Sequence, residues 1–401
     1  MLVGVDIGTS KVVAIVAETR GEDDIEIIGL GTHPSKGLKN GVVVDIESTT
    51  YAIKKSIAEA EAMAGCHIGS CYVGISGSHI RGLNSEGVVP IKDGEVRYGD
   101  VDRVIETAQA MAIPADQRLL HVLPRDYIID KQDGIKEPLG MAGSRLEAKV
   151  HLVTCSENSS LNIHKCINAS GLDVEAFVLE QLASSYSVLT NDERDLGVCL
   201  IDIGGGTTDM AVFMDGSIAF TDVIPIAGDH VTNDIAQALR TPPTQAEHIK
   251  QRYGCAVSSL TKPEEVMMVP GMGGRPEREL SRQALADVLE RRYVEIFSMA
   301  QQKLSLSGFE SLIPAGVVLT GGAAKVEGAS ELAEEIFHAP VRLGSPHSIE
   351  GFSEIINNPI YATSVGLLLY GQKQLQEDHL NYIHRDKNIL NRLSRWFGGN
   401  L

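Results

Sequence analysis

The chain has 401 residues, of which 43% are hydrophobic, and a formal net charge of −18. This length exceeds one typical hydrophobic core and predicts roughly two to three domains. The negative charge disfavours nucleic acid as a partner, because phosphate contacts need clusters of Lys and Arg that the body of the chain lacks. The six cysteines contain no C-x-x-C pair, which indicates free thiols in a reducing, cytoplasmic compartment. We also expect neither a signal peptide nor a transmembrane span.

The first predicted element is a β-hairpin over residues 3–18, VGVDIGTSKVVAIVAE, with an apolar strand on each side of a polar turn. Exposed backbone N–H groups in a glycine-bearing turn form a concave site for anions, and polyphosphate is the ligand that this favours. Taken alone, such a sequence is more often a tight turn without a ligand. The residues that would face the phosphates are Asp6, Gly8, Thr9, Ser10 and Lys11.

The chain then changes its pattern twice. Apolar residues at helical spacing predict a helix over residues 51–64 that ends at Gly65, and a strand follows over 72–80. From about residue 81 to residue 156, glycine-interrupted strands surround one helix near residues 101–111. We therefore expect an inserted subdomain over this segment.

A second hairpin is predicted over residues 200–215, LIDIGGGTTDMAVFMD, and it repeats the first with Asp202 in register with Asp6. Two such hairpins about half a chain apart predict two related α/β halves, joined at the polar segment 190–195. The Walker motif and the G-x-G-x-x-G motif opening a helix are absent, so phosphates would lie between the hairpins. The second turn adds Gly204, Gly205, Gly206, Thr207 and Thr208 to the candidate site.

Two hairpins in register favour a phosphate site over two unrelated tight turns. Asp6 and Asp202 supply the paired carboxylates that Mg²⁺ uses, with waters between the carboxylates and the ion. Lys11 and Thr207 offer a cation and a hydroxyl near the phosphate oxygens.

The second half carries a further insertion over about 228–314, with helices predicted near 245–253 and 282–306 and a loose stretch, VPGMGGRPE, between them. Glu247 and Lys250 share a helical face and could bind ribose hydroxyls or a base edge, although a solvated ion pair fits the spacing equally. Residues 317–328, VVLTGGAAKVEG, are compatible with an ordinary β–α turn. Together with the two hairpins they predict a nucleoside site, in which a purine lies on Gly321, Gly322 and Ala323.

The C-terminal segment combines a polar stretch with a basic, amphipathic one. In KNILNRLSRWF (387–397) five apolar residues share one helical face, whereas the surrounding chain end is basic in an otherwise acidic protein. This pattern predicts an interfacial helix on anionic lipid, and the alternative is a terminal helix docked on the protein itself. The residues expected to contact the membrane are Ile389, Leu390, Arg392, Leu393, Arg395, Trp396 and Phe397.

The ordered motifs D-I-G-T-S-K, D-I-G-G-G-T-T-D and L-T-G-G-A resemble those of the actin-like ATPase superfamily, which includes chaperones and sugar kinases. Within it, the whole chain is similar to the FtsA family of bacterial cell-division proteins, most specifically at 34–49, 148–155, 182–209 and 273–293. The resemblance implies an α/β, actin-like two-lobed fold. In that fold duplicated mixed β-sheets are flanked by helices, and a subdomain called 1C is inserted in the first lobe.

The resemblance also implies where the subdomains lie. Residues 1–80 would form subdomain 1A, completed by 157–192 and about 356–372, with 81–156 as subdomain 1C. Residues 193–227 would form subdomain 2A, completed by 315–355, with 228–314 as subdomain 2B. A linker over 373–386 would lead to the membrane helix over 387–401. The two connecting helices, near 180–189 and 358–371, contain small residues that would let the lobes rotate.

The function that the resemblance implies is a nucleotide-dependent scaffold with at most slow ATP hydrolysis. Such proteins bind Mg-ATP, polymerise into actin-like filaments on the inner membrane, anchor FtsZ through its C-terminal tail and recruit later division proteins. Glu180 matches a water-positioning residue of the superfamily, and its neighbour Gln181 could substitute. The FtsZ tail would bind subdomain 2B, where Arg282, Arg291 and Arg292 are candidate contacts.

Three other functions compete with this interpretation. A pilus-assembly actin relative is the nearest, and the amphipathic C-terminal segment argues against it, since such a scaffold need not carry its own membrane helix. A small-molecule kinase of the same fold would have no use for that segment. A chaperone would need a peptide-binding domain after residue 371, where only about 30 residues remain.

Overall fold

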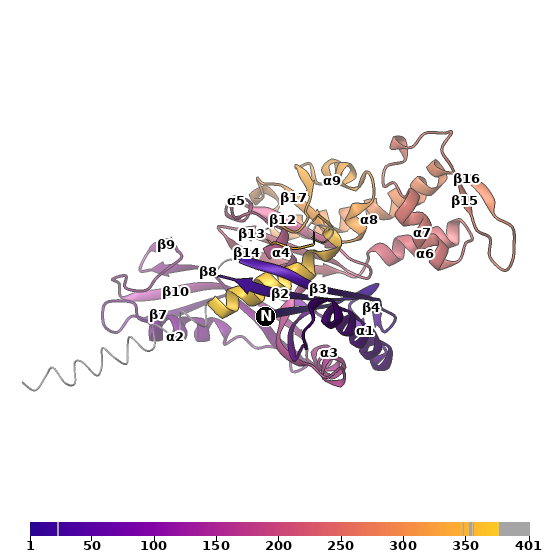
Figure 1. Cartoon of the computed structure of the whole chain (residues 1–401). Helices are drawn as coiled ribbons and strands as arrows, with labels where there is room; N and C mark the ends of the chain where they lie inside the picture. The colour runs from indigo at the N-terminus through magenta and orange to yellow at the C-terminus, as the bar shows by residue number, and fades with distance from the viewer. Residues whose placement is uncertain (22–23, 348, 353–354, 356, 377–401) are drawn as a thin grey trace, which may run out of the picture.

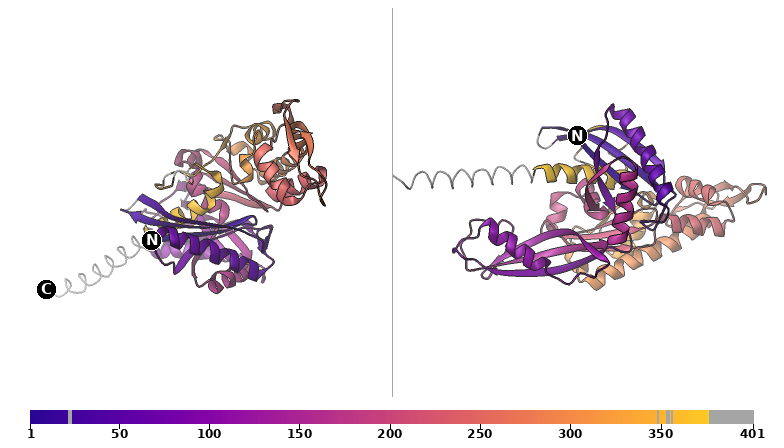
Figure 2. Two further views of the ribbon diagram at one scale, coloured as in Figure 1. Left: turned by 45° about the vertical axis from the view of Figure 1, so that its right-hand side comes forward. Right: turned by 90° about the horizontal axis from the view of Figure 1, so that it is seen from below.

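The computed structural model describes residues 1–21, 24–347, 349–352, 355 and 357–376. It consists of two lobes, each built on a five-stranded mixed sheet, with further elements at opposite ends of the molecule (Figures 1 and 2). This confirms the predicted α/β, actin-like two-lobed fold. Within the described part, no helix combines the length and apolarity that a bilayer crossing requires.

The two five-stranded sheets have the same plan. The first has the order β11-β6-β1-β2-β3 and the second the order β18-β17-β12-β13-β14. In each, the central strand pairs antiparallel with the next strand in sequence and parallel with a later one. The strands of the first sheet are β1 (Leu2–Ile7), β2 (Lys11–Arg20), β3 (Asp24–Pro34), β6 (Ser70–Ile75) and β11 (Asp173–Leu179). Those of the second are β12 (Val198–Ile203), β13 (Thr208–Met214), β14 (Ser217–Ile224), β17 (Val317–Thr320) and β18 (Val341–Leu343).

Helices cover the first sheet and join it to the second. Helix α1 (Ile46–Ala64) begins five residues earlier than the apolar spacing predicted, because the Asp45 side chain accepts a hydrogen bond from the Ser48 N–H and caps its N-terminus. The other first-lobe helices are α3 (Glu157–Ala169) and α4 (Glu180–Val188). The predicted polar joint at 190–195 is largely a short helix, α5 (Asn191–Leu196), in which Thr190 and Glu193 form a capping box.

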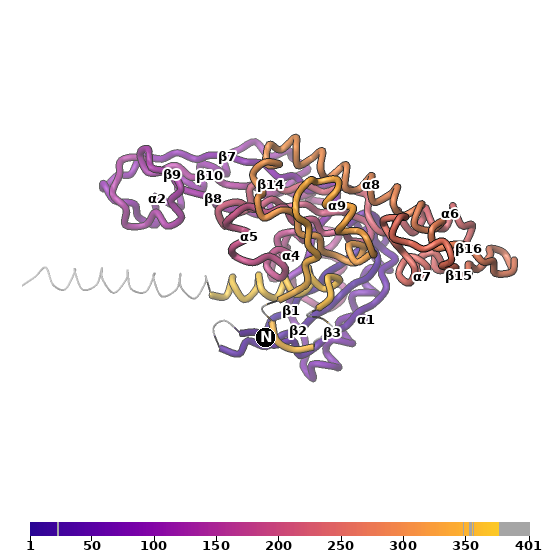
Figure 3. The backbone as a smooth tube through the Cα atoms, turned by 90° about the horizontal axis from the view of Figure 1, so that it is seen from above, coloured from indigo at the N-terminus to yellow at the C-terminus, as the bar shows by residue number. Residues whose placement is uncertain are grey.

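Between β6 and α3 the chain forms a separate antiparallel sheet, here called the inserted sheet, with the order β7-β10-β8-β9. Its elements are β7 (Arg81–Pro90), α2 (Tyr98–Gln109), β8 (Gln117–Ile129), β9 (Gln132–Ile135) and β10 (Arg145–Ser156). It has its own apolar core, in which Val104 and Ala108 of α2 pack with Leu146 and Val150 of β10. Its strands also contact β14 of the second lobe (Figure 3). There the His151 ring is hydrogen-bonded to Thr221 Oγ1 at 2.9 Å.

The insertion in the second lobe, here called the helical insert, is packed around the 26-residue helix α8 (Arg282–Ser307). Helix α6 (Gly228–Ala238) was not predicted, since no Ser, Thr, Asp or Asn stands at its N-cap, Ala227. The stretch predicted to be loose lies within a β-hairpin, and residues 270–277 form the loop between its two strands. The remaining elements here are α7 (Pro243–Tyr253), η1 (Ser258–Leu260), β15 (Val266–Val269) and β16 (Arg278–Ser281).

The remaining elements lie in two parts of the chain. β4 (Leu38–Lys39) and β5 (Val42–Val43) come between β3 and α1, and η2 (Glu310–Leu312), η3 (Ala323–Lys325), α9 (Ala329–Phe337) and η4 (Pro359–Tyr361) follow α8. A helix over residues 362–376 then packs Val365 and Leu368 against the first sheet (Figure 1). Residues 373–376 therefore continue a helix and do not belong to the predicted linker. The membrane helix predicted at 387–401 lies outside the described residues.

Candidate functional site

The two hairpin turns have the same backbone geometry. The Gly8 N–H donates to the Lys11 carbonyl at 3.0 Å, and the Gly204 N–H donates to the Thr207 carbonyl at 3.0 Å. Asp6 and Asp202 precede these turns at equivalent positions of β1 and β12. The structural repeat therefore brings one carboxylate from each lobe to the same place.

A cavity of about 580 Å³ lies between the lobes at these turns, within the size range of small-ligand sites. All but one of the predicted nucleotide-binding residues line it, together with Glu180. The exception is Thr208, which is fully buried and donates to the Ile226 carbonyl at 2.8 Å. Side chains alternate along β13, so Thr208 points away from the cavity. The predicted residues that line it are Asp6, Gly8, Thr9, Ser10, Lys11, Glu180, Asp202, Gly204, Gly205, Gly206, Thr207, Glu247, Lys250, Gly321, Gly322 and Ala323.

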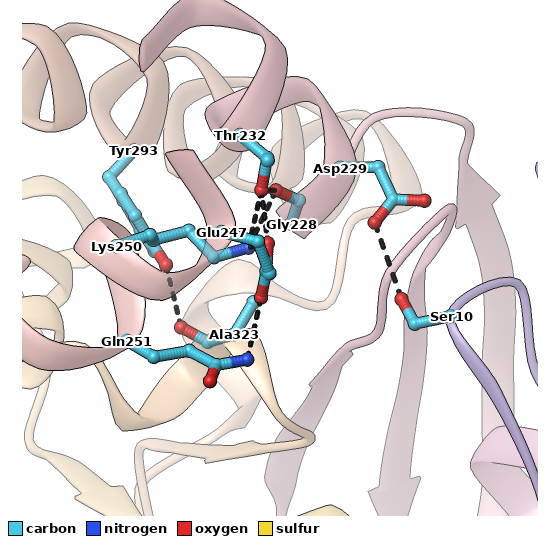
Figure 4. A network of polar contacts seen from close by, with 9 residues as sticks. All are labelled: Ser10, Gly228, Asp229, Thr232, Glu247, Lys250, Gln251, Tyr293 and Ala323. Atoms are coloured by element: carbon cyan, nitrogen blue, oxygen red, sulfur yellow. Dashed lines mark hydrogen bonds and ion pairs between the residues drawn. The ribbon is translucent and has the colours of Figure 1, made fainter. Parts of the chain in front are cut away.

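Two of the three consecutive glycines are needed for contact between the two turns. A Cβ at Gly205 would lie 2.0 Å from Ser10 Oγ, and a Cβ at Gly206 would lie 2.4 Å from Thr9 Oγ1. The sequence predicted glycines that make room for phosphate. At these two positions they make room for the opposite lobe, and Ser10 Oγ also donates across the cleft to Asp229 Oδ1 at 3.3 Å (Figure 4).

The carboxylates of the cavity destabilise one another when ionised. Burial, followed by the nearby carboxylates of Asp209 and Asp6, raises the pKa of Asp202 to about 7. Burial raises the pKa of Asp6 to about 6, although the Lys11 ammonium opposes the shift. Burial and these three aspartates also raise the pKa of Glu180 well above its usual range. A bound cation would relieve this repulsion.

Sequence reasoning gave no role to Asp209, although it ends the D-I-G-G-G-T-T-D motif. Its carboxylate accepts hydrogen bonds from Thr207 Oγ1 at 2.9 Å and from Ser76 Oγ, which stands at the end of β6 in the first lobe. Burial raises the pKa of Asp209 to about 6. The signal that could have found it is its pairing with Asp202 across the hairpin, since the two are register partners.

The candidate magnesium site has carboxylates but no ready-made chelate. In the part of the chain that the structure describes, no three His, Cys, Asp or Glu side chains converge closely enough to hold a metal ion. An ion at Asp6 and Asp202 would complete its shell with water and phosphate oxygens, as Mg²⁺ commonly does. The residues present therefore fit the predicted water-mediated binding.

At the other end of the cavity, a buried polar network joins α6 to α7 (Figure 4). Lys250 Nζ donates to the Gly228 carbonyl at 3.0 Å and to Thr232 Oγ1 at 2.8 Å, and it lies 2.8 Å from Glu247 Oε2. The Lys250 side chain is only 8% exposed, so a solvated ion pair does not describe it. Burial would raise the pKa of Glu247, but the Lys250 ammonium and its hydrogen bond outweigh burial and lower it.

The three arginines predicted to bind a partner do not form one surface. Arg282 lines the cavity and pairs with Glu265 at 2.9 Å and with Glu327. Arg292 forms an ion pair with Asp234 at 2.6 Å. Together with Arg291, it lines a groove between α6 and α8. Residues nine positions apart on a helix lie on opposite faces, so Arg282 and Arg291 cannot contact one peptide side by side.

Gln181 cannot replace Glu180 in this arrangement. It is fully buried, does not line the cavity, and its Nε2 donates to the Met210 carbonyl at 3.5 Å. Consecutive helix residues point about 100° apart, so only one of the pair faces the cavity.

Two duplicated lobes with a cavity between matching turns define an actin-like protein. Among solved structures, the fold is similar to the PilM-PilN type IV pilus biogenesis complex, with a TM-score of 0.69 and 17% identity over 92% of this chain and 98% of that chain. It is also similar to MreB 5 of Spiroplasma citri bound to AMPPNP, with a TM-score of 0.56 and 16% identity over 95% of this chain and 98% of that chain.

Sequence comparison gives the particular family. The family "Cell division protein FtsA" matches residues 199–366, and the family "SHS2 domain inserted in FTSA" matches residues 77–154. The Cell division protein FtsA of Pseudomonas aeruginosa is 59% identical, over 100% of this chain and 98% of the relative. The chain belongs to the FtsA family of cell division proteins. The identity to this relative favours the cell-division interpretation over the pilus-assembly one.

Proposed function

We propose that this cell division protein binds Mg-ATP in the cavity between its lobes and acts as a nucleotide-dependent scaffold. The observation that carries the proposal is the meeting of two equivalent turns, each preceded by a buried aspartate, at one cavity. Exposed backbone N–H groups in the turns suit phosphates, and Lys11 adds a cation. A similar fold, MreB 5 of Spiroplasma citri, was solved with AMPPNP, which supports a nucleotide as the ligand.

The cavity supports slow hydrolysis at most. Glu180 lines the cavity, and burial together with the nearby aspartates raises its pKa, which favours the neutral carboxyl. A neutral carboxyl can orient a water molecule by hydrogen bonds but is a poor acceptor of the water's proton. Positioning without strong general-base help fits a protein that uses ATP mainly as a conformational switch.

The scaffold function places the protein at the cytoplasmic face of the inner membrane at the division site. There it would polymerise into actin-like filaments, anchor FtsZ by its C-terminal tail, and recruit later division proteins. The apolar face and basic residues of 387–397 support a membrane contact through anionic lipid. One such helix binds weakly, so a filament that aligns many copies would strengthen attachment.

Electron microscopy of the full chain on anionic lipid monolayers, with and without Mg-ATP, tests this proposal. We expect filaments on the lipid in the presence of Mg-ATP and few or none in its absence. A monomer that stays off the lipid under both conditions would contradict the scaffold function. Phosphorylation of a sugar by such a monomer would favour the kinase alternative.

A further inference from the structure

The helix over residues 362–376 begins at the cavity that was assigned to the nucleotide. Thr363 lines this cavity and is 8% exposed, and the next residue, Ser364, is fully buried. Thr363 Oγ1 donates to Asp202 Oδ2 at 3.2 Å. Ser364 Oγ lies 3.5 Å from Asp6 Oδ2, at the outer limit of a hydrogen bond. Consecutive helix residues point about 100° apart, so two neighbouring hydroxyls reach carboxylates of different lobes.

The Asp202 carboxylate is held on its other side as well. A Cβ at Gly321 would lie 2.3 Å from Asp202 Oδ1, and Gly321 has a φ of +87°. The carboxylate thus packs directly against the backbone of the third cavity loop. Thr363 donates a hydrogen bond to its other oxygen, and the Ser184 hydroxyl of α4 also favours the ionised carboxylate.

The same helix also crosses α4, the other helix at the junction of the lobes. Ser187 Oγ of α4 donates to the Ala362 carbonyl at 2.7 Å. A Cβ at Gly366 would lie 1.8 Å from the Ala183 carbonyl oxygen, so the two backbones are in direct contact. Thr363 therefore stands between this crossing and the carboxylate of the second lobe.

We propose that Thr363 is a positioning residue, which holds the ionised Asp202 carboxylate in the orientation that binds the magnesium ion of the nucleotide. Ser364 plays the weaker corresponding part at Asp6. This inference rests on the proposed binding of Mg-ATP. It assigns the helix over 362–376 a direct part in the nucleotide site, besides its packing against the first sheet.

The charges around Asp202 explain why the Thr363 hydroxyl should affect the ionised form of this carboxyl. The carboxylates of Asp209 and Asp6 disfavour the ionised form of Asp202. Lys11 is the cation that acts on Asp6. A hydrogen bond donated by Thr363 favours ionised Asp202, and bonds to charged groups are stronger than those between neutral groups. Loss of the hydroxyl should therefore leave this carboxylate oxygen without the Thr363 donor and weaken magnesium binding.

Calorimetric titration of the full chain with ATP, in Mg²⁺ and separately in EDTA, tests the inference. Thr363→Val removes the hydroxyl and keeps the shape, whereas Thr363→Ser retains a donor. The matched control is Thr261→Val, because Thr261 is also 8% exposed but donates to the Ser258 carbonyl, outside the cavity lining. Thermal unfolding without ligand checks that each variant folds, and Thr363→Ala is a second hydroxyl-free variant if Thr363→Val does not.

We expect Thr363→Val to weaken Mg-ATP binding by about tenfold, or about 1.4 kcal/mol, and ATP binding in EDTA by much less. Thr363→Ser and Thr261→Val should bind like the parent, and Ser364→Ala should lose about threefold or less, because its hydroxyl makes the longer contact.

Two results would overturn the inference while leaving the proposed function standing. One is unchanged Mg-ATP affinity in both hydroxyl-free variants. The other is an equal loss with and without Mg²⁺, which would mean that the hydroxyl only supports lobe packing. If the parent itself does not bind Mg-ATP, the proposed function is wrong and the inference falls with it.

Discussion

Asp202 is a buried carboxyl whose ionisation costs folding free energy. Its pKa is 3.8 in the unfolded chain and about 7 in the fold, owing to burial first and then to Asp209 and Asp6. Between these values the folded protein binds more protons than the unfolded protein, so the free energy of unfolding falls as pH rises through this window. In the absence of a ligand, the ionised Asp202 carboxylate therefore lowers the free energy of unfolding. A bound cation would offset this cost.

We therefore predict opposite effects of Asp202→Asn on stability and on binding. Without ligand, the variant should be more stable than the parent at pH 8 by on the order of 2 kcal/mol, and the gain should shrink towards pH 5. Mg-ATP should raise its melting temperature less than that of the parent. Denaturant unfolding at both pH values measures the first effect, and a thermal shift measures the second.

The control for this prediction is Asp133→Asn, at an exposed position of β9. It should change neither stability nor the response to Mg-ATP. A stability gain of Asp202→Asn that is the same at pH 5 and pH 8 would show that the pKa of this carboxyl is not raised in the folded protein. An undiminished response to Mg-ATP would place the phosphates elsewhere.

At the scale of residues, the sequence indicated which residues of the two hairpin turns line the cavity. It did not indicate the residues from other segments that contact them. Asp6, Asp202 and the glycines could be predicted to lie together because the two hairpins repeat each other in register, although each turn alone could be an ordinary tight turn. Ser76 and Thr363 could not be predicted, since they lie far from both motifs in sequence and meet Asp209 and Asp202 only in the folded chain. Ordinary Ser and Thr residues in apolar segments carry no signal of such contacts.

At the scale of elements, the crossing of α4 and the helix over 362–376 depends on Gly366. Gly366→Ala would place a Cβ 1.8 Å from the Ala183 carbonyl oxygen, so the helices must separate. We predict a loss of about 1–3 kcal/mol, the range for overpacked sites, together with weaker Mg-ATP binding. Denaturant unfolding and calorimetry measure the two effects.

Gly99→Ala in α2 is the matched control, because a Cβ at Gly99 meets no atom within 4 Å. This second helical glycine-to-alanine change should raise stability by up to about 1 kcal/mol, since alanine restricts the unfolded chain. Were Gly366→Ala as stable as the parent, the close crossing of the helices would not exist in solution.

The groove between α6 and α8 allows a sharper test of the partner surface than the sequence did. Among the described residues, Arg291 is exposed and forms no ion pair, whereas Arg292 is bonded to Asp234 and Glu295. We predict that Arg291→Glu weakens binding of an FtsZ tail peptide severalfold without loss of stability. Arg292→Glu should in addition destabilise the helical insert, because the new carboxylate would lie beside those of Asp234 and Glu295 and repel them.

Fluorescence anisotropy of a labelled FtsZ tail peptide measures this binding, and calorimetry with Mg-ATP provides the control for the nucleotide site. Arg282→Glu is expected to disturb nucleotide binding, since Arg282 lines the cavity. Peptide affinity that survives Arg291→Glu would move the partner surface away from this groove.

The elements themselves show which sequence signals are sufficient. The duplicated hairpins and α8 were predicted because apolar periodicity extends over each of them. Helix α6 was missed because no side chain of the usual capping type precedes it, and β15 and β16 were missed because four-residue strands are too short to show alternation.

At the scale of the whole molecule, membrane attachment is predicted to reside in residues 387–401. Anionic vesicles should shift the emission of Trp396, the only tryptophan, to the blue. Deletion after Asp386, or Trp396→Glu, should leave a protein that binds Mg-ATP but stays in the supernatant when vesicles are sedimented. High salt should weaken attachment without abolishing it, because the apolar contribution is not screened.

Neutral vesicles are the control for this experiment, since the basic residues should give them weaker binding than anionic ones. If the truncated protein sediments with lipid as well as the full chain does, the segment is docked on the protein and the membrane contact lies elsewhere.

The packing of the helix over 362–376 on the first sheet also constrains the order in which a nascent chain can fold. One face of that sheet, with Leu2, Ile15 and Ile27, is covered by Val365 and Leu368. The strands of the first sheet are therefore synthesised more than 150 residues before the helix that covers them. The strands of the second sheet, in contrast, all lie within residues 198–343. During synthesis, the second lobe can therefore finish folding first. Until the helix over 362–376 is made, an apolar face of the first lobe stays exposed, which favours aggregation and chaperone binding. Because Thr363 belongs to the same helix, the proposed nucleotide site is complete only when this helix has packed onto the sheet.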